Sequence, residues 1–181
     1  VSRATRVLEA GFVKKMNDDG WHTILAAGVD RNILVYDADA AAGQFTKRQI
    51  SLMKTVMRRN AGGNSASVSR GRLTDVYMSP EGIEDIRNWG VDQADEATRR
   101  EIYTGADDSA ALTRIFGVNL HGLDELGQSQ EYQNYFTSNL SGSLGPSSDV
   151  ELCVGLDLQS NDSFVMPVKQ EVTIFEDDNL H

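Results

Sequence analysis

The side chains that could carry out acid–base or metal chemistry are few and widely spaced. Acidic pairs stand at positions 18–19, 107–108 and 177–178, and the three histidines are His22, His121 and His181. Metal sites need ligands that converge, and no two histidines have a ligand spacing. Paired carboxylates work as acid and base when burial separates their pKa values, which adjacent residues in polar segments rarely achieve. We therefore expect no metal site and no catalytic carboxylate pair.

The sequence also has no signal for a catalytic nucleophile or for a phosphate-binding loop. The single cysteine, Cys153, lies in the apolar stretch VELCVGLDL with no histidine nearby, so we interpret it as a buried or edge thiol. A lone cysteine also excludes an intrachain disulfide and fits a reducing compartment. Gly62-Gly63 and the later glycines match neither a P-loop nor a dinucleotide fingerprint. The sequence therefore predicts no catalytic residue, no cofactor and no enzymatic activity.

Length and charge restrict the function further. The chain has 181 residues, enough for one domain or two small lobes, and a formal net charge of −10. Such a charge disfavours general binding to nucleic-acid phosphates, although it leaves room for a local basic face. No apolar run approaches the roughly 18 residues of a membrane span. The chain begins at Val1 without a signal-peptide pattern and stops after an acidic segment, so we expect a part of a longer protein.

One stretch, Leu73 to Gly90, has the clearest local signals: a short strand that runs into a capped helix. Ser79 is a good N-cap, and Pro80 stands at the first helical position, where its missing N–H costs nothing. Gly90 is placed to end the helix as a C′ glycine. The spacing predicts two apolar faces, one on the strand and one on the helix: Val76 and Met78, and Ile83 and Ile86.

Helices are predicted on both sides of this unit. An N-terminal helix is predicted from Ser2 to about Asp18, with an apolar stripe at i+4 spacing: Ala4, Leu8, Phe12 and Met16. The alternative is a longer helix, in which Trp21, Ile24 and Leu25 extend it past Gly20 to an end near Gly28. A second helix runs from Thr46 to Asn60, where Thr46 and Gln49 have the spacing of a capping box. Its predicted buried face is Ile50, Met53, Val56 and Met57. Residues 91–101 are expected to form a solvated helix or an ordered excursion, and residues 128–139 a short polar helix.

Strands and loops fill the remainder. Strands are predicted at 32–36 (NILVY), within 113–126, where Gly117 and Gly122 mark bulges or turns, at 150–158, and at 164–175, which Pro167 interrupts. In the strand at 150–158, five apolar residues share one side: Val150, Leu152, Val154, Leu156 and Leu158. The segments 61–71 and 141–148 are loops by composition.

Two features have alternative interpretations. Arg58-Arg59 and Arg99-Arg100 are either solvated helix ends or cations for salt bridges between subunits. The aromatic group Tyr132, Tyr135 and Phe136 is either an interface anchor or the cover of a small core. The sequence does not decide between them.

The order of these elements resembles the major capsid proteins of tailed double-stranded DNA phages, the Hong Kong 97-like family. Two short segments carry the resemblance: VYMSPEGIEDIRNW, Val76 to Trp89, and RIFGVNLHGLDEL, Arg114 to Leu126. The closing stretch FVMPVKQEVTIFEDDN is also similar. The resemblance covers the whole chain as a pattern.

The resemblance implies an α+β fold divided into two lobes. Residues 1–29 would form the spine helix of a peripheral lobe, residues 30–145 an axial lobe of mixed sheet with flanking helices, and residues 146–181 the strands of the peripheral lobe. The N-terminal arm and extended hairpin that usually precede the spine helix in this family are absent from the sequence. So is the last strand that usually follows the acidic segment.

The implied function is structural. The resemblance points to a self-assembling subunit of an icosahedral phage head, in which pentamers and hexamers enclose DNA without binding it specifically. Implied partners are further copies of the chain and scaffold, portal or decoration proteins, with no membrane; assembly would occur in the host cytoplasm and the product would be the virion. The alternatives are the shell protein of a bacterial encapsulin-like nanocompartment and an unrelated α+β enzyme with acidic catalytic residues.

Overall fold

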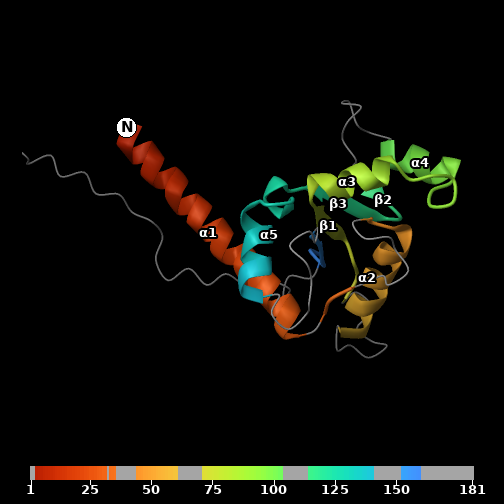
Figure 1. Ribbon diagram of the computed structural model, residues 1–181, viewed down its shortest axis with the longest axis horizontal. Helices are drawn as coiled ribbons and strands as arrows, with labels where there is room; N and C mark the ends of the chain where they lie inside the picture. Colours follow the sequence, from red (N-terminus) through yellow and green to blue (C-terminus); the bar gives the residue numbers. More distant parts are fainter. Residues whose placement is uncertain are drawn as a thin grey trace, which may run out of the picture.

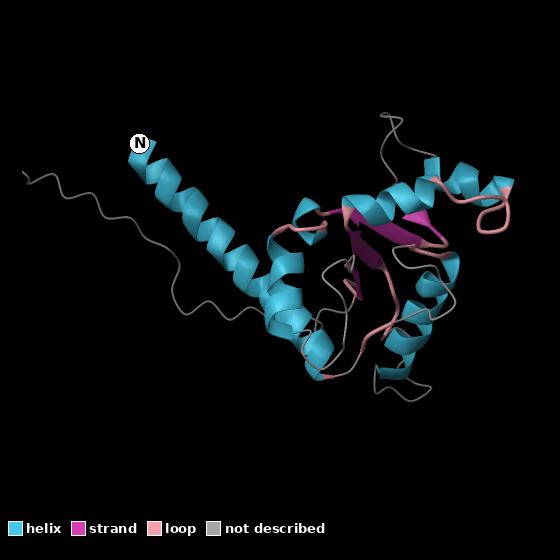
Figure 2. Ribbon diagram, viewed as in Figure 1, coloured by secondary structure: helices cyan, strands magenta, loops and turns pink. Residues whose placement is uncertain are grey.

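The computed structural model describes residues 3–31, 33–35, 44–60, 71–103, 114–140 and 152–159. Helices and strands are mixed in an α+β arrangement around a small sheet (Figure 2). The first helix, α1 (Arg3–Asp30), is 28 residues long, and its N-terminal half extends away from the rest of the fold (Figure 1). The longer of the two predicted N-terminal helices is thus confirmed, and it ends two residues later than expected.

The sheet has four strands in the order β2-β3-β1-β4: β1 (Asp75–Met78), β2 (Arg114–Ile115), β3 (Val118–Gly122) and β4 (Cys153–Leu156). The strand β1 pairs with β3 in parallel and with β4 antiparallel, and β2 pairs antiparallel with β3. The predicted mixed sheet with flanking helices is therefore present.

The unit β1–α3 follows its local sequence signals. Helix α3 (Pro80–Arg87) begins as predicted, because the Ser79 hydroxyl accepts a hydrogen bond from the Gly82 N–H at 3.1 Å and Pro80 stands in the first turn. The predicted end was wrong. Asn88 is the C-cap, and Gly90 lies one residue beyond C′ without a left-handed backbone conformation. Its carbonyl instead accepts hydrogen bonds from the N–H groups of residues 93 and 94, so Gly90 starts the next turn.

A tight hairpin joins β2 to β3. Its two-residue turn consists of Phe116 and Gly117, with φ angles of 48° and 75°. Two positive φ angles are typical of a type I′ turn, whose twist suits antiparallel strands. Lys54 donates a hydrogen bond to the Phe116 carbonyl at 2.6 Å, so helix α2 fastens the turn. The predicted turn at Gly117 is confirmed, whereas Gly122 is the last residue of β3 and pairs with Met78.

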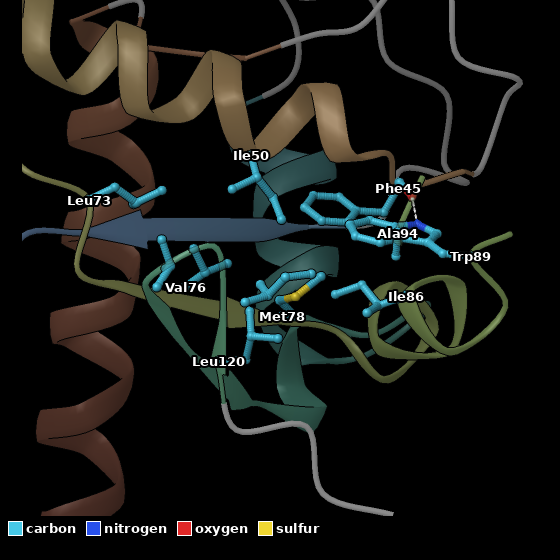
Figure 3. Close-up of a cluster of buried hydrophobic side chains, with 11 residues drawn as sticks. Phe45, Ile50, Leu73, Val76, Met78, Ile86, Trp89, Ala94 and Leu120 are labelled. Carbon is cyan, nitrogen blue, oxygen red and sulfur yellow. Dashed lines mark hydrogen bonds between the residues drawn. The ribbon is translucent and has the colours of Figure 1, made fainter. Parts of the chain in front are cut away.

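One face of the sheet is covered by α2 (Lys47–Asn60) and α3. Their contact forms the larger core, whose fully buried side chains are Ile50, Val76, Met78, Ile115 and Val118 (Figure 3). Met53 and Met57 pack against it, as the predicted buried face of α2 requires. The predicted capping box is half formed, because the Gln49 side chain accepts from the Thr46 N–H at 2.8 Å.

Phe45 connects the start of α2 to the end of α3. Its ring stacks on Trp89 with centroids 6.3 Å apart, its carbonyl accepts from the Trp89 indole N–H at 2.8 Å (Figure 3), and its N–H donates to Asp85 at 2.7 Å. Helix α4 (Glu96–Tyr103) follows, with Asp95 accepting from the Thr98 N–H. Of the two alternatives expected for residues 91–101, a helix is observed from Glu96 onward, and the non-helical residues before it include the buried Ala94.

The other face of the sheet meets α1 and the segment η1 (Asp124–Leu126), α5 (Glu131–Tyr135) and the π-helical turn η2 (Phe136–Leu140). The smaller core lies here, between the second half of α1 and α5. Its buried members are Leu25, Leu126, Tyr132, Phe136 and Leu152. The short helix predicted within residues 128–139 is confirmed.

Several strand predictions have other outcomes. Residues 33–35, the described part of NILVY, are not in a strand. The strand predicted at 150–158 is confirmed for residues 153–156, and Leu152, Val154 and Leu156 share a side, but Leu158 lies outside it and is 47% exposed. The predicted segments at 61–70, 141–148 and 164–175 lie outside the described residues.

The strand β4 pairs along β1, so it belongs to the same sheet as the unit at residues 73–90. The division into lobes at residues 29 and 145 stays a prediction, but the sheet continues across the second boundary. Gly155 allows α2 to approach this pair of strands. A Cβ atom on Gly155 would lie 2.6 Å from Leu73 Cδ1 and 2.7 Å from Met53 Cε.

We expect Gly155→Val to destabilise the fold by about 1–3 kcal/mol, because the larger side chain must displace both Leu73 and Met53 from the core. Urea unfolding would measure the change. The control is Gly11→Ala, because a Cβ on Gly11 meets nothing within 4 Å; this change should stabilise α1 by up to about 1 kcal/mol. A Gly155→Val protein as stable as the parent would contradict the close packing of α2 on β4.

Candidate functional site

The structure joins two residues that are 46 positions apart into an Asp–His pair. Strands β1 and β3 run in parallel with Asp75 opposite Asn119 and Tyr77 opposite His121. The His121 ring contacts Asp75 Oδ1 through Nε2 at 2.8 Å and stacks on Tyr77 with centroids 4.7 Å apart. Asn119 donates to the same carboxylate oxygen at 3.2 Å.

The Asp75 carboxyl is held in its charged form. Burial alone would raise its pKa, but hydrogen bonds from Thr74, His121 and Asn119 together outweigh it, so the pKa of Asp75 is lowered. The residue is only 7% exposed, whereas the His121 side chain is 42% exposed. The pair therefore consists of a buried Asp75 carboxylate and a partly exposed His121 imidazole.

An Asp–His pair is two-thirds of a nucleophilic triad and orients the imidazole as a base. Within the described residues, His121 is hydrogen-bonded to Asp75 and to no hydroxyl or thiol. The nearby Thr74 hydroxyl hydrogen-bonds Asp75, lies 3.2 Å from the Leu156 carbonyl and accepts from the Leu158 N–H at 2.9 Å, so its contacts go to Asp75 and the backbone. The arrangement supports a structural role, in which His121 supplies a hydrogen bond to a buried carboxylate.

The predicted acidic pair at 18–19 is divided between two cations. Asp18 accepts from Lys14 at 2.8 Å and from the Tyr132 hydroxyl at 2.9 Å, and Lys14 also donates to Glu131 at 2.8 Å. Asp19 pairs separately with Lys15. The hydrogen bond from Lys14 is the main reason that the pKa of Asp18 is lowered, whereas burial and then Asp18 raise the pKa of Tyr132. These contacts tether α1 to α5.

The aromatic residues of α5 belong to the core of their own chain. Trp21 packs edge-on against Tyr77, at 5.1 Å between centroids, and stacks on Tyr132 at 5.9 Å. His22 stacks on Tyr135 at 3.8 Å. Tyr132 and Phe136 are 4% and 6% exposed. Of the two interpretations left open by the sequence, the cover of a small core is the one observed.

Among the described residues, the other predicted chemistry-bearing side chains form no metal-binding group. Cys153 is half-buried at the start of β4. Within the described parts of the chain, no group of three His, Cys, Asp or Glu side chains could hold a metal ion. His181, the acidic pairs at 107–108 and 177–178, and Gly62-Gly63 lie outside the described residues. Arg100 pairs with Glu96 in its own helix, and Arg99 donates to the Trp89 carbonyl.

The most extensive unusual feature is apolar surface on α1. Five large apolar side chains in its N-terminal half are exposed: Val7, Leu8, Phe12, Val13 and Met16, at 65%, 61%, 51%, 59% and 37%. They include three residues of the predicted stripe, and Ala4 is exposed as well. We call Leu8, Phe12 and Met16 the α1 stripe. Contiguous exposed apolar surface on a soluble domain marks a site of interaction.

The α1 stripe is not an extension of the face that docks on the core. In the second half of the helix, Trp21, Leu25 and Val29 contact the smaller core at four-residue spacing. Met16 and Trp21 are five residues apart, which is about 140° around a helix. The helix therefore has two apolar faces, one packed on its own chain and one exposed.

No family model, curated protein or solved structure matches this chain. None of the described helices has the length and apolar character required to cross a membrane. The functional argument therefore rests on the geometry of the described residues and on the sequence resemblance.

We expect His121→Phe to keep the ring stack on Tyr77 but remove a hydrogen bond to a buried carboxylate, at a cost of about 1 kcal/mol at pH 7. The folded-state pKa of Asp75 is below its unfolded value, so its stabilising contribution is complete above the unfolded pKa and lost as pH falls through the folded pKa. In His121→Phe that loss below pH 4 should be smaller.

Urea unfolding at neutral pH and at several pH values below 4 measures both effects. His121→Gln is the matched control, because its amide retains a donor for Asp75. Equal acid dependence in the parent and the Phe variant would show that His121 does not stabilise the Asp75 carboxylate.

Proposed function

We propose that this chain is a structural subunit of an icosahedral phage head with the Hong Kong 97-like fold, and that it self-assembles into pentamers and hexamers that enclose double-stranded DNA. The observation that carries the proposal is the α1 stripe: a long helix with one docked apolar face and one exposed apolar face. Such a helix requires association.

The form of the sheet domain also supports the proposal. The two segments that resemble the capsid family are Val76 to Trp89 and Arg114 to Leu126, and they form adjacent elements: β1 with α3, and β2 with β3 and η1. They pack together as one lobe, and α1 projects from it as the expected spine helix would (Figure 1).

The interior of the lobe favours a structural function over catalysis. Two groups of polar side chains are paired: Asp75 with His121 and Asn119, and Asp18 with Lys14 and Tyr132. Among the described residues, His22 Nε2 and Glu81 Oε2 are buried without a hydrogen-bond partner. Paired polar groups rigidify a core, and a shell subunit must keep one shape in many copies. Each copy then presents the same surface to its neighbours, which is the condition for closed rings.

Removing apolar area from the stripe tests the proposal. We expect Phe12→Ser to weaken self-association of the chain by roughly tenfold or more, because a buried phenyl group contributes about 1.5–3 kcal/mol. Sedimentation velocity across a concentration series, with electron microscopy of the assembled material, measures the change. The matched control is Arg6→Ser, which changes an exposed residue on another side of the same helix.

The parent chain should form rings or closed shells under assembly conditions, and Phe12→Ser should not. A parent chain that stays monomeric at high concentration, in every assembly condition and with its scaffold, would overturn the proposal. Equal assembly by Phe12→Ser and the parent would show that the α1 stripe is not an association surface.

A further inference from the structure

Helix α2 is basic, whereas the chain as a whole is acidic. Its 14 residues include five of the 17 basic residues and none of the 27 acidic residues: Lys47, Arg48, Lys54, Arg58 and Arg59. The rest of the chain therefore carries a formal charge of −15, against −10 for the whole. When a basic surface and an acidic surface are separated on one molecule, the basic surface of one copy attracts the acidic surface of another, which favours contact between copies.

The exposed cations of α2 are set apart from its buried residue Ile50. Ile50 is 1% exposed and points into the larger core (Figure 3). On the C-terminal half of the helix, Lys54, Thr55, Arg58 and Arg59 line a wide, open hollow of about 460 Å³. Lys54 is half-buried there and donates to the Phe116 carbonyl, whereas Arg58 and Arg59 are exposed. These two arginines suit carboxylate side chains, because arginine binds a carboxylate through two parallel hydrogen bonds. We call this surface the α2 hollow.

A complementary surface lies on another part of the fold. Four acidic residues stand at the start of α3, in the turn η1 and at the start of α5: Glu81, Asp124, Glu125 and Glu131, of which Glu131 is paired with Lys14 of α1. The Glu81 carboxylate accepts from the Gln128 N–H at 3.2 Å, which holds α3 against this segment. Asp124, Glu125 and Glu131 are exposed. Helices α2 and α5 lie on opposite sides of the sheet (Figure 1).

We propose that the α2 hollow of one copy binds the acidic surface around η1 of the next copy. This inference rests on the proposed function and identifies a contact within the ring. Because the two surfaces differ and lie on opposite sides of the fold, the contact is head-to-tail, and repeated head-to-tail contacts close into rings when the rotation between copies fits. A second copy is favoured over nucleic acid as the partner, because the formal charge of −15 on the rest of the chain would repel a phosphate backbone.

Charge reversal on each surface, singly and together, tests the contact. We expect Arg59→Glu or Glu125→Lys alone to weaken self-association by about threefold to tenfold. The double variant should recover most of the loss, because the reversed charges again attract. Self-association of the parent should fall as salt rises from 50 to 300 mM, since exposed charges are screened. Sedimentation velocity measures all four proteins, and thermal unfolding confirms that each is folded.

The control is Arg100→Glu, which makes the same change in net charge at an exposed site on α4. A loss equal to that of Arg59→Glu would attribute the effect to net charge and overturn the inference. Single variants that associate like the parent, or a double variant with no recovery, would also overturn it. So would an Arg59→Glu protein that loses affinity for a duplex DNA oligonucleotide while its self-association stays unchanged, because the hollow would then bind phosphate.

These outcomes are separable from those of the proposed function. In one outcome, the parent forms shells, Phe12→Ser does not, and both charge-reversal variants assemble like the parent. That result would retain the proposed function and exclude this contact. A parent chain that shows no self-association even at low salt would exclude both.

Discussion

The fold depends on the burial of β1, in which Asp75, Val76 and Met78 are buried and Tyr77 is half-buried. This strand is hydrogen-bonded along both edges and covered on both faces, so each of its residues must suit a different neighbour. Val76 and Met78 have no exposed surface and face the helices α2 and α3. Asp75 faces the other layer, where an unpaired carboxylate would cost several kcal/mol. The parallel partner β3 meets this requirement by placing Asn119 and His121 beside it.

The same constraint explains which features the sequence could predict. The cap at Ser79 and Pro80, the turn at Gly117 and the buried face of α2 depend on residues a few positions apart, and all three were predicted. The Asp75–His121 pair depends on the register between strands 46 residues apart, which no local pattern encodes. The strand expected at 32–36 failed for a related reason, because apolar β-branched residues indicate burial as readily as pairing.

Two other errors have local causes. Gly90 has the residue type of a C′ position, but the helix ends earlier, with Asn88 as its C-cap, and Trp89 after it donates its indole N–H to the Phe45 carbonyl. The sequence could not reveal this contact, since Phe45 lies 44 residues away. The apolar stripe on α1 was found correctly, but its spacing could not show whether the chain itself covers it. The structure makes this distinction, because Trp21 and Leu25, on the docked face of α1, contact the smaller core.

The α1 stripe and the α2 hollow would contribute differently to an assembled ring. Apolar contact is non-directional, so a helix stripe can bind a neighbour at several rotations with similar free energy. Charged surfaces add less affinity, but unlike charges must meet and like charges must not, which fixes register and orientation. A ring closes only if every copy makes the same contact at the same angle. A subunit that associated through α1 alone would lack that restriction, and the proposed contact through the positive charge on α2 would supply it.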